Sequence, residues 1–108
     1  MPDTGDFAWL TFDPQAGREQ AGRRPALVLS PAIYNGKSGL ALVCPITSQV
    51  KGYPFEVAVP AGHGATGVIL ADHVKSVDWK ARRAERAGRC PDETVDEVRA
   101  RLAPLLGY

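Results

Sequence analysis

Short apolar runs, each bounded by glycine, proline or charged residues, recur along the whole chain. Continuous apolar character at residues 25–30 and 40–46 is typical of strands buried on both faces, and alternation at residues 55–59 is typical of a half-buried strand. The pattern predicts six strands, at residues 7–12, 25–30, 40–46, 55–59, 68–71 and 74–79.

Glycine and proline mark the turns between these runs. Pro31 and the pair Asn35 and Gly36 predict a loop before the third strand, and a glycine-rich turn at residues 62–67 precedes the fifth. Six short strands at close spacing favour a compact antiparallel barrel or a strongly curved sheet, because closure protects the strand edges. We therefore expect a mainly β fold.

The C-terminal part changes to a helical period. Pro91 suits a first helical position, and Asp92 and Glu93 complement the helix dipole. Apolar residues then recur at spacings of three and four, at Val95, Val98, Leu102 and Leu105. We expect one amphipathic helix that covers the barrel, with Pro104 distorting its last turn and residues 105–108 forming a loosely ordered apolar tail.

A chain of 108 residues has the size of one domain, which we assign to residues 1–108. The apolar runs are too short for a membrane helix, and the acidic N-terminus lacks the basic start of a secretion signal, so we expect a soluble, cytoplasmic protein. Cys44 and Cys90 have no zinc-type spacing, so we expect reduced thiols and neither a metal nor a cofactor.

Charge is unevenly distributed although the formal net charge is only +1. Residues 18–89 hold eleven Lys and Arg against five acidic residues, whereas the two ends hold two basic residues against seven acidic ones. This distribution is compatible with a surface that follows a phosphate backbone. The basic run at residues 80–89 could follow a nucleic-acid backbone, and the alternative is a solvated segment. Dinucleotide, P-loop, esterase-elbow and zinc-protease motifs are absent from the sequence.

Three polar clusters could carry chemistry. Glu19, Arg23 and Arg24 precede the second strand, where a carboxylate can accept a proton and a guanidinium can bind a phosphate through two hydrogen bonds. The second cluster is Thr47, Ser48 and Gln49, and the third is Asp72 with His73. The alternatives are solvated loop charges, a strand-end hydroxyl that bonds local backbone, and a structural Asp and His pair.

Several blocks of the chain resemble the MazF/PemK family of toxin endoribonucleases, also called mRNA interferases, and the MazF branch in particular. They read GDFAWLTFDP at residues 5–14, EQAGRRP at 19–25, VLSP at 28–31, KGYPFEV at 51–57 and ADHVKS at 71–76. The resemblance implies an SH3-like antiparallel β-barrel with a C-terminal helix, assembled as a homodimer. It also implies a groove for single-stranded RNA and an antitoxin partner that occupies this groove.

The same resemblance implies cleavage without a metal, which leaves a 2′,3′-cyclic phosphate and a 5′-hydroxyl. Motif positions put the family's catalytic residues at Arg24, Thr47 and Glu19, and an Asp that some members use at Asp72. In this hypothesis the RNA 2′-hydroxyl attacks the phosphate, Glu19 removes its proton, Arg24 stabilises the phosphorane oxygens and Thr47 donates a supporting hydrogen bond. The identity of the general acid stays open.

Further RNA contacts are expected from side chains near these catalytic positions. His73 stands where better-known members have Gln, and Ile46 and Ser48 flank Thr47, so the cleavage sequence stays open. The expected RNA-binding residues are Arg23, Ser48, Gln49, Lys51, Asp72, His73 and Lys75. For Lys51 the alternative is simple turn formation. Two other functions remain possible from the sequence: a non-catalytic toxin similar to CcdB that binds a protein such as gyrase, and an RNA-binding barrel without cleavage.

Overall fold

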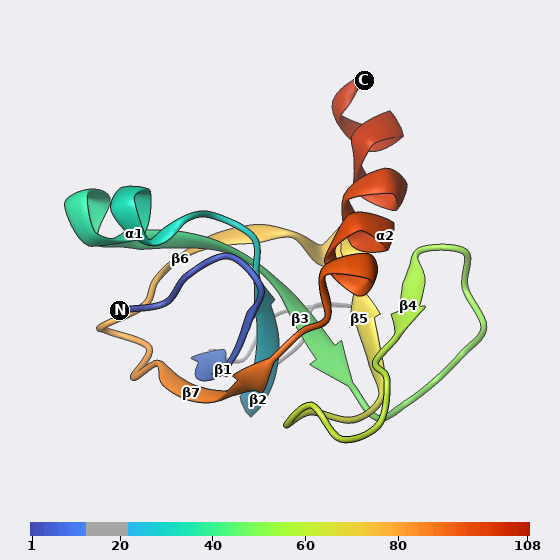
Figure 1. Ribbon diagram of the computed structural model, residues 1–108, viewed down its shortest axis with the longest axis horizontal. Coiled ribbons are helices and arrows are strands. Elements are labelled where there is room, and N and C mark those ends of the chain that lie inside the picture. The colour runs from blue at the N-terminus through green and yellow to red at the C-terminus, as the bar shows by residue number, and fades with distance from the viewer. Residues whose placement is uncertain (13–21) are drawn as a thin grey trace.

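The protein forms a strongly curved antiparallel sheet with one long helix against it (Figure 1). The computed structural model describes residues 1–12 and 22–108. The strands are β1 (Asp6–Phe12), β2 (Gly22–Val28), β3 (Leu40–Thr47), β4 (Glu56–Ala58), β5 (Val68–Leu70), β6 (Lys75–Asp78) and β7 (Glu85–Arg89). The helices are α1 (Ala32–Ser38) and α2 (Asp92–Leu102), with 3₁₀ turns η1 (Ala71–His73) and η2 (Ala103–Leu106).

The strand order is β4-β5-β3-β2-β1-β7, and β6 also pairs with β3. β3 bends between its two halves, because its first half pairs with β6 and its second half pairs with β5. In the described residues β4 and β7 form the two ends of the path, so the barrel is open. The six strands predicted from the sequence and the mainly β, SH3-like fold class are confirmed, with shifts of a few residues at the strand ends.

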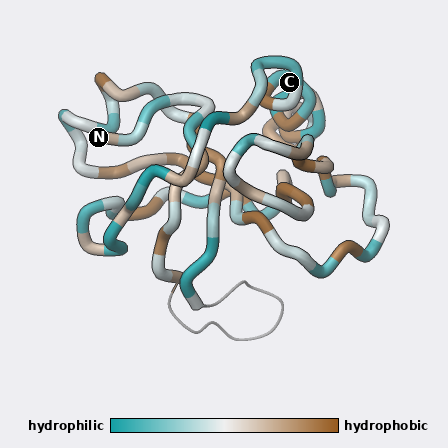
Figure 2. The backbone as a smooth tube through the Cα atoms, turned by 60° about the horizontal axis from the view of Figure 1, so that its bottom comes forward, coloured by the Kyte–Doolittle hydropathy of each residue, from teal (hydrophilic) through white to brown (hydrophobic). Residues whose placement is uncertain are grey.

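Hydrophobic clusters lie on both faces of the curved sheet. One cluster includes Phe7, Leu27 and Ile46 and packs against Val95 and Val98 of α2. The other is built on the opposite side of the strands from Ala8, Leu10, Phe12, Ala26, Val28, Ala41, Val43 and Val77. Figure 2 shows the hydrophobic segments of the strands meeting in the middle of the molecule. Because side chains alternate along each strand, adjacent residues of one strand serve different clusters.

The loop predicted around Asn35 and Gly36 is wrong, because this segment forms α1. The Asn35 side chain is fully buried, accepts a hydrogen bond from the Ser30 hydroxyl at 2.6 Å, and donates to the Pro2 and Ser30 carbonyls. These contacts hold a segment whose residues are weak helix formers. The helix therefore depends on tertiary contacts that a turn-like sequence pattern does not reveal.

The sequence did not predict β7, which pairs with β1 in the second half of the basic run at residues 80–89. The Arg86 and Arg89 side chains are largely exposed, as expected for a solvated charge run. β7 lies at one end of the strand path and lacks the apolar alternation that the sequence reading required. Arg83 adopts a left-handed conformation with φ of 58° in the tight turn before it. The turn is closed by hydrogen bonds from the Ala84 N–H to the Trp79 carbonyl and from the Arg82 N–H to the Asp78 carbonyl.

The C-terminal helix is confirmed, with buried Val95, Val98 and Leu102 on one face. α2 ends at Leu102, and the chain tightens into η2, which contains Pro104. The expected distortion at Pro104 is therefore observed as a change of helix type. None of the helices in the part of the chain that the structure describes has the length and apolar character that crossing a membrane requires.

Candidate functional site

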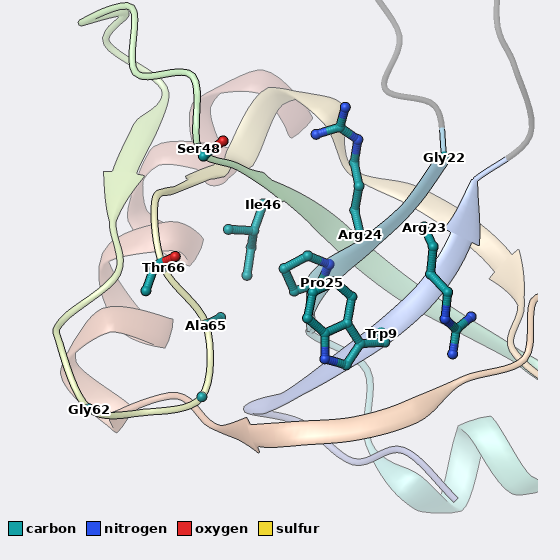
Figure 3. Close-up of a pocket in the computed structure, with 11 residues that line it drawn as sticks. Trp9, Gly22, Arg23, Arg24, Pro25, Ile46, Ser48, Gly62, Ala65 and Thr66 are labelled. Atoms are coloured by element: carbon teal, nitrogen blue, oxygen red, sulfur yellow. The ribbon is translucent and has the colours of Figure 1, made fainter.

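A pocket of about 610 Å³ opens where β2 begins and β3 ends (Figure 3). Its walls combine an apolar surface, two hydroxyl groups and two guanidinium side chains. The side chains that line it are Trp9, Pro25, Ile46, Ala65, Ser48, Thr66, Arg23 and Arg24, and the backbone of Gly62 and Gly64 closes one wall.

The pocket forms because β2 and β3 stop pairing just before their ends. Their pairing runs from Val28 opposite Val43 to Ala26 opposite Pro45. The next residue of β2 is Pro25, which has no N–H to donate to a neighbouring strand. Arg24 and Thr47 lie beyond the last of these pairs, near the start of β2 and at the end of β3. The sequence-predicted cationic and hydroxyl residues therefore lie on neighbouring strand ends.

Arg24 is half-buried and lies at the rim of the pocket. Figure 3 shows its side chain extending away from Trp9 and Pro25. Glu19, the expected proton acceptor, lies outside the described residues. Phe12 and Gly22, the residues that flank the undescribed segment 13–21, are paired with each other across β1 and β2.

Arg23 points to the other side of β2 and ties this strand to β7. Its guanidinium donates to the Thr11 hydroxyl at 3.1 Å and to the Arg83 carbonyl at 2.8 Å, and it forms an ion pair with Glu85 at 2.9 Å. The two adjacent arginines therefore have different environments, although sequence reasoning treated them as one cluster. RNA binding by Arg23 stays a prediction.

Thr47 is only 6% exposed at the end of β3. Its hydroxyl oxygen accepts a hydrogen bond from the Gln49 N–H at 3.1 Å, which is the local backbone bond that the sequence left as the alternative. Gly67 approaches the Thr47 carbonyl so closely that an added Cβ would collide with it, and its φ is 110°. The end of β3 is therefore rigidly packed, whereas Ser48 and Gln49 beyond it are exposed.

Lys51 lies in the loop between β3 and β4 and is not among the residues that line the pocket. Its N–H donates to the Glu56 carboxylate, as does the N–H of Gly52. Its ammonium group lies 6.0 Å from the centroid of the Tyr53 ring. These contacts support the turn-forming alternative, and an RNA contact from Lys51 stays a prediction.

Lys75 begins β6 and pairs with Val43, so its side chain lies on the same sheet face as Phe12. The Lys75 ammonium is 5.5 Å from the centroid of the Phe12 ring, a cation–π distance. Asp72 and His73 form η1 just before this strand, where Asp72 is exposed and His73 is half-buried. The structure therefore puts these three residues at the start of β6 rather than in the pocket.

Neither cysteine is a candidate nucleophile. Burial, with a smaller contribution from the Asp72 carboxylate, raises the pKa of the Cys44 thiol to about 12. Burial likewise raises the pKa of the Cys90 thiol to about 11. Within residues 1–12 and 22–108, no three His, Cys, Asp or Glu side chains gather in a way that could hold a metal ion.

Sequence reasoning missed two side chains that line the pocket, Trp9 and Thr66. The sequence placed Trp9 in the first strand without a role at the site, and the structure leaves it 39% exposed. Strand alternation sets Trp9 on the same face as Phe7, which is fully buried, so the sequence carries no signal that this position is exposed.

Comparisons with known proteins agree with this architecture. A family model described as a PemK-like, MazF-like toxin of type II toxin-antitoxin systems matches residues 3–106. The endoribonuclease toxin MazF of Escherichia coli K12 is 50% identical over 107 residues, covering 99% of this chain and 96% of the relative.

Solved structures are similar over the same length. MazF of Deinococcus radiodurans superposes with a TM-score of 0.94 at 59% identity, covering 99% of this chain and 97% of that one. A MazE-MazF structure from the same organism gives a TM-score of 0.90 at 59% identity, covering 99% and 96% of the two chains. The family match and these identities over nearly the full length show that the chain belongs to the PemK-like, MazF-like toxins of type II toxin-antitoxin systems.

Proposed function

We propose that this chain is the endoribonuclease toxin of a type II toxin-antitoxin system and that it cleaves single-stranded RNA without a metal ion. One observation carries this proposal: Arg24 lines a pocket at the start of β2, and Thr47 ends the neighbouring strand β3. A fixed guanidinium can hold two oxygens of a phosphodiester and stabilise the extra negative charge of a phosphorane. The naming of the E. coli relative as an endoribonuclease supports the same activity.

In the proposed reaction the 2′-hydroxyl oxygen attacks the neighbouring phosphorus, and the bond from phosphorus to the 5′-oxygen breaks. Glu19 takes the proton of the 2′-hydroxyl, Arg24 binds the phosphorane oxygens and Thr47 supplies a hydrogen bond. The departing 5′-oxygen gains a proton, so the products carry a 2′,3′-cyclic phosphate and a 5′-hydroxyl. The attacking oxygen belongs to the substrate, so an all-deoxy strand is bound but not cleaved.

Substrate contacts beyond the reacting phosphate come from polar side chains around the site. Ser48 lines the pocket and lies next to exposed Gln49 at the end of β3. We assign contacts to bases or phosphates to Arg23, Ser48, Gln49, Lys51, Asp72, His73 and Lys75. Single-stranded RNA suits such a site because its unpaired bases can turn outward from the backbone.

The proposed partners follow from the family. MazE and MazF of D. radiodurans were crystallised together, and this chain is proposed to bind a MazE-like antitoxin. It acts as a homodimer and in the cytoplasm, where messenger RNA is translated.

The decisive experiment incubates the full chain with single-stranded RNA in excess chelator and identifies the fragment ends. We expect cleavage to persist and the fragments to carry cyclic phosphate and 5′-hydroxyl ends. Arg24→Ala is expected to lower the cleavage rate by about 10²-fold or more, by analogy with loss of one oxyanion donor. Arg99→Ala is the matched control, because the exposed Arg99 side chain pairs with Asp96 on the surface of α2 and is not among the residues that line the pocket.

Two other outcomes would reject the proposal. A folded Arg24→Ala variant that cleaves at the parental rate would remove the assigned role of this guanidinium. Binding of RNA without any fragments would favour an RNA-binding barrel that does not cleave. A CcdB-like toxin that acts on a protein is not favoured, because the 50% identical relative is named an endoribonuclease.

A further inference from the structure

We propose that the pocket between β2 and β3 is a nucleotide subsite in which Trp9 stacks on an unpaired RNA base, with Arg24 at the pocket rim. This inference rests on the proposed function and extends it by naming the residue that binds the base. The pocket supplies the three types of group that an RNA strand requires: an aromatic surface, hydroxyl groups and a cation.

The aromatic surface is Trp9. This residue lies opposite Pro25 in the pairing of β1 with β2, and both side chains line the pocket. Phe7 and Leu10 of the same strand are almost completely buried, whereas 39% of Trp9 is exposed. Figure 3 shows the indole beside Pro25 on the floor of the pocket. An exposed indole at a pocket floor offers a face for stacking that any of the four bases can use.

The polar groups lie on the other walls. Ser48 extends from the end of β3 and Thr66 comes from the loop before β5, and both residues line the pocket together with Trp9. Each hydroxyl can donate one hydrogen bond and accept others, which suits the edge of a base. The volume of about 610 Å³ lies within the range typical of small-ligand pockets.

The wall that carries Thr66 is held against β7. Gly64 packs on the backbone of Ala87 and Gly88, and the Arg89 N–H donates to the His63 carbonyl at 3.2 Å. A pocket wall fixed in this way is formed before a ligand arrives, which lowers the entropy lost on binding. Arg24 stands at the rim with its side chain directed away from Trp9, so the phosphate that it holds belongs to a neighbouring nucleotide rather than to the base on Trp9.

Fluorescence can test this directly, because the chain has only two tryptophans. In a Trp79→Phe background all tryptophan emission comes from Trp9. The probes are the four nucleoside 3′,5′-bisphosphates, and inorganic phosphate is the control without a base. We expect saturable quenching by all four nucleotides and none by phosphate, with excitation at the red edge of the tryptophan band.

Two variants separate stacking from simple filling of space. Trp9→Phe keeps an aromatic face, whereas Trp9→Leu keeps an apolar side chain without one. Equilibrium dialysis should find weaker nucleotide binding for Trp9→Leu by about 10-fold or more and a smaller loss for Trp9→Phe. Circular dichroism spectra that match the parent confirm that both variants fold.

A cleavage assay on the parent protein, run in parallel, distinguishes the two proposals. Cleavage without Trp9 quenching, or equal nucleotide binding by Trp9→Leu and Trp9→Phe, overturns the subsite and leaves the nuclease proposal intact. Saturable quenching without cleavage supports the subsite and overturns the nuclease proposal. Quenching by inorganic phosphate equal to that by nucleotides would also reject base stacking.

Discussion

Thr47 shows how one hydroxyl can serve both structure and chemistry. Its oxygen accepts a hydrogen bond from the Gln49 N–H and its side chain is almost buried. Replacing Thr47 by Val removes this bond and leaves the N–H without its partner. We expect a loss of about 1 kcal/mol in unfolding free energy, measured by denaturant titration, together with a lower cleavage rate.

Thr47→Ser is the matched control, because it keeps the hydroxyl and loses only a methyl group. Its cleavage rate should remain close to that of the parent, while its unfolding free energy falls slightly. If Thr47→Val cleaves as fast as Thr47→Ser, the hydroxyl has no part in the reaction and only its backbone bond matters.

The two cysteines give a prediction on reactivity and pH. Because burial raises the pKa of Cys44 to about 12 and that of Cys90 to about 11, both thiols stay protonated in the folded chain at mildly alkaline pH. In the unfolded chain a thiol ionises near its ordinary pKa of 9.0. The folded state therefore binds protons more tightly, and this contribution to stability is present below about pH 9 and is lost as the pH rises further.

Two measurements check this prediction. At pH 8 neither thiol should react with a thiol reagent on the time scale on which both react in denaturant. The denaturation midpoint should fall between pH 9 and pH 11, and the fall should be smaller in Cys44→Ala. Rapid labelling of the native protein would contradict the burial of these residues.

Some site residues could be predicted from the sequence and others could not. Arg24 and Ser48 carry recognisable chemistry and do line one pocket. Thr47 bonds its local backbone because it ends a strand, and Arg23 and Arg24 have different surroundings because side chains alternate along a strand. Neither effect can be seen when these residues are read only as clusters in the sequence. Trp9 was missed because an aromatic residue in an apolar strand is usually a core residue.

At the scale of elements, prediction succeeded where burial leaves a pattern. β3 and α2 have apolar residues at the spacing of their own secondary structure, and both were recognised. α1 and β7 do not. α1 depends on the buried side chain of Asn35, and β7 lies at one end of the strand path, so neither requires an apolar period that sequence reading can detect.

The loop that carries Thr66 is also fixed by a feature that only the fold reveals. Gly64 has φ of 97°, and an added Cβ would collide with the Ala87 carbonyl. Gly64→Ala should therefore lower the unfolding free energy by about 2 kcal/mol or more, from backbone strain and displacement of β7. Gly62→Ala is the control, because Gly62 has φ of 86° but no atom within 4 Å of its added Cβ.

Gly62→Ala should cost only the backbone strain, about 1 kcal/mol. Thermal unfolding of the two variants under the same conditions measures the difference. Equal losses of stability would mean that the contact between the loop and β7 is not tight.

At the scale of the whole molecule, cationic side chains from neighbouring elements lie at different points along the length of β3. Its C-terminal end leads to the pocket with Arg24, and Lys75 lies on the neighbouring β6. Lys37 lies in the last turn of α1, which precedes the N-terminal end of β3. Figure 1 shows α1 near the N-terminal end of β3, at the opposite end from its C-terminal arrowhead. A phosphate backbone bound at one end should therefore not reach Lys37.

Salt dependence of binding tests this arrangement, with an all-deoxy oligonucleotide that covers the mapped cleavage site. Each contact between a cation and a phosphate of a single strand adds about 0.7 to the slope of log affinity against log salt. Contacts from Arg24, Lys51 and Lys75 together predict a slope of about −2. Lys75→Gln should reduce its magnitude by about 0.7, whereas Lys37→Gln should leave it unchanged. An equal reduction in both variants would mean that the oligonucleotide responds only to net charge and that Lys75 does not lie on its path.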